Sequence, residues 1–171
     1  MKKISFQADV LPLKNELFRL ALRITLNRAE AEDVVQETML KVWNRREQWD
    51  QLDSIEAFCL TICRNLALDK LKRLDNQAAT LEGTPDAADL SYTSNPEEQA
   101  VQRDRIALVR RLIDQLPEKQ RSVMQLRDME GKSYKDIAVV LGISEEQVKV
   151  NIFRARQTIK KAFIKNEEYG L

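Results

Sequence analysis

The chain of 171 residues contains no histidine, only two cysteines, and four residues each of glycine and proline. The absence of histidine removes the commonest general base and the commonest metal ligand, and two cysteines cannot build a disulfide framework. Scarce glycine and proline, without an alternating strand pattern, indicate a helical chain. No phosphate-cradling glycine loop or nucleophilic serine motif is present. We therefore predict no enzyme, no cofactor and no bound metal.

Long apolar runs and a signal peptide are also lacking, so we expect a cytoplasmic protein without membrane insertion. The formal net charge is only +1, from 28 basic and 27 acidic residues. Bulk charge therefore gives no reason to bind nucleic acid, and any DNA affinity must come from local segregation of charge. Such segregation is present, because residues 149–165 include basic but no acidic side chains, and residues 75–102 include acidic but no basic ones.

Apolar periodicity divides the chain into two helical parts. The first part is predicted to hold three helices, at about residues 11–26, 27–46 and 53–73. Asn27 and Asp53 are expected to cap the second and third of these helices, with a polar loop around Trp49 between them. Residues 76–95 lose the periodicity and are rich in alanine, serine and threonine, which predicts a flexible acidic linker. The sequence thus predicts an all-α chain with two small domains.

The second part begins at Pro96, and a helix-turn-helix is predicted over residues 133–161. Ser133 and Ser144 stand at the starts of its two helices, and Gly142 can adopt the left-handed conformation between them. Its core is expected to consist of Ile137, Val140, Leu141, Val148, Ile152 and Ala155. The helices before it are expected to bury, among others, Ile106 and Met129. An ordinary helical hairpin is the alternative, but the positive charge favours DNA binding.

Two helices carry side chains suited to nucleic acid. The exposed side of helix 145–161 is expected to present groups that contact base edges, thymine methyls or phosphates. These are Gln147, Lys149, Val150, Asn151, Phe153, Arg154 and Arg156. The earlier helix 57–73 is expected to bury Cys59 and Cys63 as small apolar groups. Its solvent side is expected to carry Arg64, Asn65, Lys70, Lys72 and Arg73.

Three motifs, in this order, resemble the extracytoplasmic-function sigma factors of bacterial RNA polymerase. AEDVVQETMLKVWNR is similar to the family's polymerase-binding helix, ICRNLALDKLKR to its −10-reading helix, and residues 112–163 to its −35-reading domain. The resemblance implies a non-catalytic subunit that recruits core RNA polymerase to −35 and −10 promoter elements. It also implies region 2 over residues 1–75, the linker over 76–95 and region 4 over 96–171.

The resemblance further implies roles for individual residues. The largest polymerase subunit would be contacted at its clamp helices by Asp33, Gln36, Glu37 and Lys41. Promoter DNA at −10 would lie near Arg64, Asn65, Lys70 and Arg73, with residues 48–53 helping to hold a flipped base. The −35 element would be read by the exposed side chains of helix 145–161, and the acidic linker would run toward the polymerase active-site channel. Members of the family are often held inactive by an anti-sigma factor, which adds a candidate partner.

The residues alone leave a second interpretation open. A stand-alone helix-turn-helix transcriptional regulator, with an N-terminal sensing or dimerisation domain, would carry the same recognition helix. Such a regulator should bind duplex DNA tightly and specifically by itself, whereas a sigma factor needs core polymerase.

Overall fold

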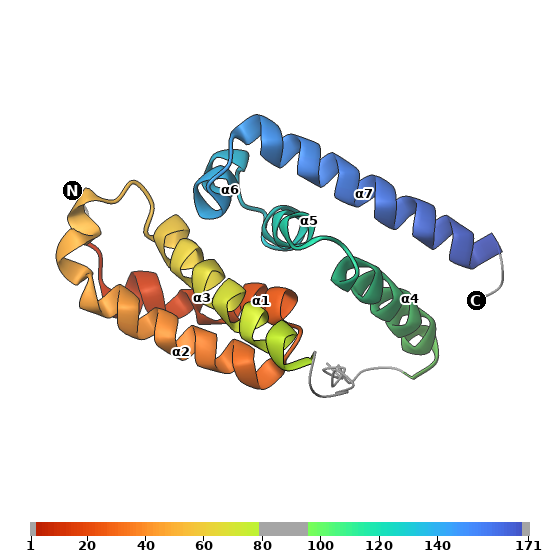
Figure 1. Cartoon of the computed structure of the whole chain (residues 1–171), viewed down its shortest axis with the longest axis horizontal. Coiled ribbons are helices and arrows are strands. Elements are labelled where there is room, and N and C mark those ends of the chain that lie inside the picture. The colour runs from red at the N-terminus through yellow and green to blue at the C-terminus, as the bar shows by residue number, and fades with distance from the viewer. Residues whose placement is uncertain (1–2, 79–95, 169–171) are drawn as a thin grey trace.

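The computed structural model describes residues 3–78 and 96–168, and all regular elements within these ranges are helices (Figure 1). The all-α prediction is confirmed. The N-terminal half, residues 3–78, contains η1 (Phe6–Val10), η2 (Leu11–Leu13), α1 (Lys14–Thr25), α2 (Arg28–Asn44), η3 (Arg46–Gln51) and α3 (Ile55–Ala78). The C-terminal half, residues 96–168, contains α4 (Pro96–Asp114), α5 (Glu118–Met124), η4 (Gln125–Met129), α6 (Tyr134–Leu141) and α7 (Glu145–Glu168). The predicted linker begins within the last turn of α3, and its residues 79–95 lie outside the described residues.

In the N-terminal half, α1, α2 and α3 each pack against the other two. The predicted cap of α2 is confirmed, because Asn27 Oδ1 accepts a hydrogen bond from the Glu30 amide at 3.0 Å. The predicted Asp53 cap is wrong. Ser54 directly precedes the first turn of α3, and its Oγ accepts from the Ala57 amide at 3.1 Å.

The segment around Trp49 is the short 3₁₀ helix η3, not the polar loop that we predicted. The indole is buried, and its Nε1–H donates to the carbonyl oxygen of Val42 at 3.1 Å. The same carbonyl, in the last turn of α2, also accepts from the Arg45 amide at 3.2 Å, so the indole bond ties η3 to the end of α2. An apolar ring with one satisfied donor therefore fixes a segment whose other residues are polar.

In the C-terminal half, α7 packs against α4, α5 and α6. Ile106 and Met129 are 51% and 48% exposed, so the prediction that both are buried is wrong. Met129 ends the π-helix η4, whose wider turn breaks the 3.6-residue stripe used to place it inside. Ile106 belongs to α4, which packs mainly against one helix and needs only one buried stripe.

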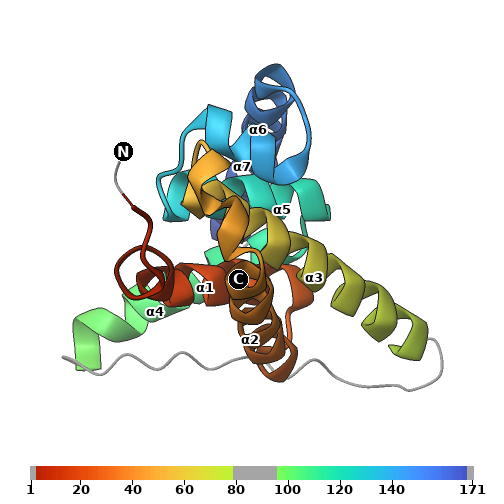
Figure 2. The same ribbon diagram turned by 90° about the vertical axis from the view of Figure 1, so that its left-hand side faces the viewer.

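The two halves are docked on each other. The C-terminal half sets α5 against α1 and α6 against α3, as Figures 1 and 2 show from two directions. Buried apolar side chains from both halves form one continuous cluster. Within residues 3–78 and 96–168, no helix combines the length and apolar character needed to cross a lipid bilayer.

Candidate nucleic-acid and partner interfaces

The helix-turn-helix is built by its caps as the sequence predicts. Ser133 Oγ accepts from the Asp136 amide at 3.1 Å at the start of α6. Gly142 ends α6 with φ +66°, a left-handed conformation that glycine adopts without steric cost. At the start of α7, Ser144 and Gln147 complete a capping box, each side chain accepting from the other's amide at 3.1 Å. These local bonds fix where both helices begin and where they turn.

The predicted core between α6 and α7 is confirmed. All six apolar side chains expected there are buried, and they are Ile137, Val140, Leu141, Val148, Ile152 and Ala155. Burial of one helix stripe leaves the opposite stripe of α7 at the surface. The recognition face is therefore a consequence of this packing.

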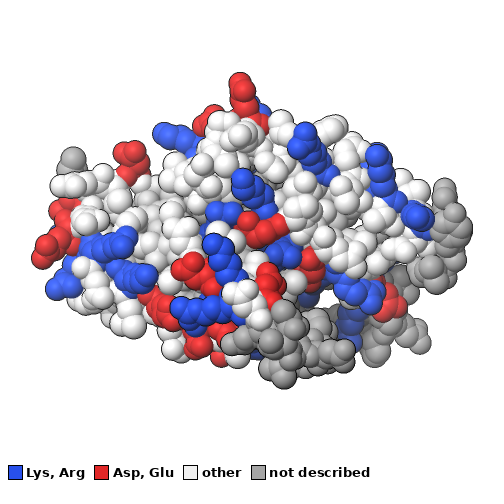
Figure 3. All heavy atoms as spheres, viewed as in Figure 1, with Lys and Arg blue, Asp and Glu red and all other residues white. Residues whose placement is uncertain are grey.

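The exposed stripe of α7 combines basic and apolar side chains. Phe153 and Val150 are 63% and 46% exposed, and Lys149 and Arg154 are exposed beside them. In Figure 3, lysine and arginine side chains follow α7 along the edge of the molecule. Large apolar groups left in water next to cations suit a surface that contacts thymine methyls and phosphates together.

Two amides of this helix are engaged in local bonds. Gln147 forms the cap described above, and Asn151 Nδ2 donates to the Gln147 carbonyl oxygen at 2.8 Å. In this arrangement both amides are held against their own helix. Base contacts by these two residues would require rotation of their side chains.

Arg156 has a carboxylate partner that the sequence analysis missed. Asp128, in η4, accepts from the Arg156 guanidinium at 2.5 and 3.1 Å, and these hydrogen bonds raise the pKa of Arg156. Nearby, the Arg127 guanidinium lies 4.2 Å from the centre of the Tyr134 ring, and Lys149 Nζ lies 5.7 Å from it. Arg127 of η4 and Lys149 near the start of α7 therefore share the ring of Tyr134, which begins α6.

The −10 candidates on α3 differ in accessibility. Asn65 and Arg73 are exposed as predicted, but Arg64 is buried, 6% exposed, so its predicted solvent position is wrong. Arg64 donates to both carboxylate oxygens of Glu118, at 3.2 and 2.8 Å, because α5 of the other half covers it. A single-sequence pattern holds no signal for a partner 54 residues away.

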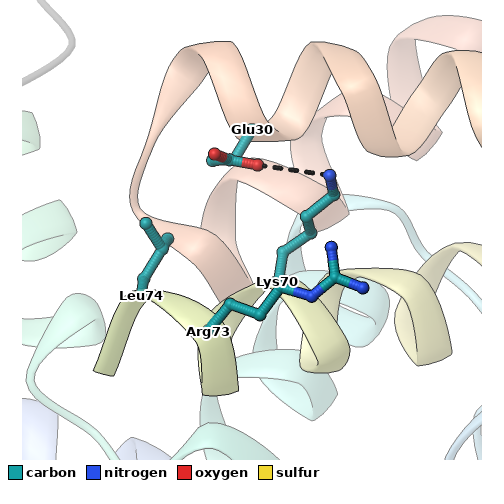
Figure 4. A pocket seen from close by; sticks show the side chains of 4 residues that line it. All are labelled: Glu30, Lys70, Arg73 and Leu74. Atoms are coloured by element: carbon teal, nitrogen blue, oxygen red, sulfur yellow. Dashed lines mark ion pairs between the residues drawn. The ribbon is translucent and has the colours of Figure 1, made fainter. Parts of the chain in front are cut away.

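Lys70 is also engaged. Its ammonium group lies 3.5 Å from Glu30 and 3.6 Å from Glu37, both on α2. Figure 4 shows Lys70 reaching to Glu30 across a shallow pocket that Arg73 and Leu74 also line. Lys70 thus joins α3 to α2 in this structure.

The polymerase-binding candidates share one face of α2. Asp33, Gln36 and Lys41 are exposed, and Glu37 is partly buried by its pair with Lys70. Leu40, which the sequence analysis missed, is 63% exposed on the same face. An i, i+4, i+7 spacing from Asp33 could have identified it. The face therefore combines one exposed apolar side chain with polar and charged ones.

Cys59 and Cys63 are buried thiols, as predicted. Burial raises the pKa of each to about 12, so neither is a thiolate near neutral pH. In the part of the chain that the structure describes, no group of three or more metal-ligating side chains comes together.

The fold and its capped recognition helix define a two-part, helical DNA-binding protein. Comparison with known families identifies the family to which it belongs. Residues 10–77 match the model of sigma-70 region 2, and residues 106–159 match that of sigma-70 region 4. The chain is 34% identical over 145 residues to the ECF RNA polymerase sigma factor SigL of Mycobacterium tuberculosis, covering 84% of this chain and 80% of SigL. The chain belongs to the extracytoplasmic-function (ECF) sigma factors of RNA polymerase.

Other relatives agree with this assignment. The RNA polymerase sigma-H factor of Pseudomonas aeruginosa is 32% identical over 168 residues, covering 94% of this chain and 86% of that one. The probable RNA polymerase sigma factor RfaY of Xanthomonas campestris is 31% identical over 157 residues, 88% of this chain, but the chain spans only 38% of its length. The fold is similar to that of sigma factor RpoE in complex with the anti-sigma factor NepR from Bartonella quintana, with TM-score 0.73, 21% identity and coverage of 91% and 94%. CnrH, in complex with the cytosolic domain of CnrY, gives TM-score 0.66 at 21% identity, with coverage of 92% and 86%.

Proposed function

We propose that this sigma factor binds core RNA polymerase through α2 and reads promoter DNA with α7 and α3. The exposed stripe of α7, with Phe153 and Val150 in water beside Lys149 and Arg154, is the observation that supports this most. The protein carries out no chemical step of its own and works in the cytoplasm with the polymerase. Region 2 is assigned to residues 1–75, the acidic linker to 76–95 and region 4 to 96–171.

The α2 face is proposed as the polymerase contact. Leu40 supplies an exposed apolar group, while Asp33, Gln36, Glu37 and Lys41 supply polar and charged groups around it. An apolar core with a polar rim is the usual anatomy of a protein interface. The charged groups would select the orientation of the clamp helices, and the exposed apolar group would supply affinity.

Promoter contacts are divided between the two halves. Lys149, Val150, Phe153 and Arg154 are proposed to contact the −35 element, with Arg156 near the phosphates. Asn65, Lys70 and Arg73, together with Arg64 once it is uncovered, are proposed to contact −10 DNA. An anti-sigma factor is a candidate partner, because the similar structure of RpoE is a complex with the anti-sigma factor NepR.

Transcription with purified components tests the proposal. The full chain, mixed with core polymerase at micromolar concentration, should bind it and start transcription at promoters found by mapping start sites after overexpression. Arg154→Ala should weaken promoter recognition by about 1–3 kcal/mol if it contacts a base edge. Arg105→Ala, which removes an exposed arginine on α4, is the matched control and should have no effect.

Two results would contradict the proposal. Failure to bind core polymerase, combined with tight specific binding to duplex DNA by the chain alone, would favour a stand-alone regulator. An equal loss of affinity for all DNA sequences on Arg154→Ala would make Arg154 a phosphate contact instead of a −35 reader.

A further inference from the structure

A carboxylate reaches the exposed stripe of α7 from outside that helix. Asp128 of η4 accepts two hydrogen bonds from Arg156, one from Nε at 3.1 Å and one from Nη2 at 2.5 Å. Arg156 follows Phe153 by three residues and Lys149 by seven, so it lies on the same side of α7 as both. A carboxylate at a surface that binds DNA is repelled by the phosphates. Asp128 therefore lowers DNA affinity unless it improves the contact that Arg156 makes.

The pairing leaves one edge of the guanidinium open. Asp128 occupies the edge formed by Nε and Nη2, whereas Nη1 of Arg156 has no hydrogen-bond partner among the described residues. The edge formed by Nη1 and Nη2 can still donate two parallel hydrogen bonds to a phosphate. Half of the Arg156 side chain is exposed, so it can bind Asp128 and DNA at the same time.

Asp128 is itself held by the turn that follows η4. The Gly131 amide donates to the Arg127 carbonyl oxygen at 3.1 Å. The Lys132 amide donates to the Leu126 carbonyl oxygen at 2.9 Å. The Arg127 guanidinium closes the same turn, because its Nη1 donates to the Lys132 carbonyl oxygen at 2.9 Å. A carboxylate on a backbone fixed in this way can fix the guanidinium that it binds.

Arg154 provides the internal contrast. It is exposed on α7 two residues before Arg156, and no carboxylate within residues 3–78 and 96–168 pairs with it. An unpaired arginine loses rotamer freedom when DNA orders it, and this loss lowers affinity. Arg156 is already ordered by Asp128 before DNA arrives, so it avoids part of that loss.

We propose that Asp128 is a positioning residue for −35 binding, which fixes Arg156 so that the open edge of its guanidinium meets one DNA phosphate. This inference rests on the proposed function, because it takes Arg156 to lie near the phosphates. It reverses the effect expected from charge alone. Removal of a carboxylate from a DNA-binding surface should strengthen binding, whereas removal of Asp128 should weaken it because Arg156 is released. A pair that only tied η4 to α7 would affect stability and not the DNA affinity of the folded chain.

Binding of the reconstituted holoenzyme to a mapped promoter, measured by fluorescence anisotropy at about 0.1 M salt, tests the sign of this effect. Asp128→Ala should weaken binding about 2- to 12-fold, the range for immobilising one long side chain on association. Asp104→Ala is the matched control, because it removes the same charge at an exposed aspartate of α4, and it should bind at least as tightly as the wild type. Asp128→Glu keeps a carboxylate for Arg156 and should retain most of the affinity.

A double-mutant cycle assigns the effect to Arg156. Arg156→Ala should weaken promoter binding about tenfold at about 0.1 M salt, and it should reduce the slope of log K against log salt by about 0.9, the value for one phosphate contact. Adding Asp128→Ala to Arg156→Ala should cause no further loss. It should strengthen binding slightly, because without Arg156 the carboxylate only repels phosphate.

Stability is controlled separately. Circular dichroism and urea denaturation verify that each variant is folded, and loss of this partly exposed pair should change the free energy of unfolding little. If Asp128→Ala unfolds, Asp128→Asn keeps the shape of the side chain and one acceptor, and it should show a smaller loss of affinity of the same sign.

The outcomes distinguish the positioning role from the proposed function. An unchanged or higher affinity of Asp128→Ala with Arg156 present would overturn the positioning role, and so would an equal loss with and without Arg156. An unchanged salt slope for Arg156→Ala would refute the phosphate contact and the positioning role together. Failure of the wild type to bind core polymerase refutes the sigma function instead, and the same cycle is then measured on binding of the full chain to duplex DNA.

Discussion

Replacing Phe153 by alanine should separate DNA recognition from folding. Phe153 lies on the recognition stripe of α7 with 63% of its surface still exposed. Full burial of a phenylalanine is worth about 1.5–3 kcal/mol, so the exposed part can contribute about 1–2 kcal/mol when DNA covers it. Because about 1.4 kcal/mol is a factor of ten, Phe153→Ala should weaken promoter binding about 5- to 30-fold.

The neighbouring residue supplies the control. Ile152 is 3% exposed within the core between α6 and α7. Ile152→Ala should therefore lower the free energy of unfolding by about 2–5 kcal/mol. Phe153→Ala should leave that free energy almost unchanged, because most of its side chain is already in water.

Two assays give the comparison. Urea denaturation followed by circular dichroism measures stability, and binding of the reconstituted holoenzyme to a mapped promoter measures recognition. The reasoning fails if Phe153→Ala destabilises the fold as much as Ile152→Ala does. It also fails if promoter affinity is unchanged, since Phe153 would then lie outside the DNA contact.

Four further predictions concern the N-terminal half. Trp49→Phe removes the hydrogen bond to the Val42 carbonyl oxygen and should lower the free energy of unfolding by about 1–2 kcal/mol in urea denaturation; an unchanged midpoint would mean that water replaces the indole N–H. Leu40→Ala should weaken core polymerase binding in a pull-down without lowering stability, because Leu40 is 63% exposed; unchanged binding would exclude this face of α2. Cys59 and Cys63 should resist iodoacetamide at about pH 8 in the native chain and react after unfolding, and rapid native labelling would contradict their burial. Burial raises the pKa of both thiols from 9.0 to about 12, so the folded chain keeps protons that the unfolded chain releases, and stability should fall as pH rises above about 9.

Local patterns were sufficient for the helix-turn-helix. Ser133, Gly142 and Ser144 act within three or four residues of themselves, through cap bonds and a left-handed turn. Apolar spacing in α6 and α7 then determines which stripe is buried and which is exposed. Both kinds of information lie in consecutive residues, so the caps, the buried core and the exposed stripe of α7 were predicted correctly from the sequence.

The apolar periodicity predicted burial less well where the chain departs from a regular α-helix or where a distant residue supplies the contact. Met129 was misplaced because the π-helix η4 shifts its stripe. Trp49 was assigned to a polar loop because the carbonyl that binds its indole is seven residues earlier, on the end of α2. Asp53 was assigned as the cap of α3, but the next residue, Ser54, makes the cap bond with the Ala57 amide.

The contrast between what the sequence determines and what the tertiary structure decides is clearest for the charged side chains. The sequence by itself determined that α3 carries Arg64 and that α5 begins with Glu118. Only the docking of the two halves decided that these residues form a buried pair, because no local rule relates residues on helices that meet through tertiary contacts. The helices and the exposed stripe of α7 thus follow from neighbours along the chain, whereas the burial of Arg64 follows from a partner across the interface.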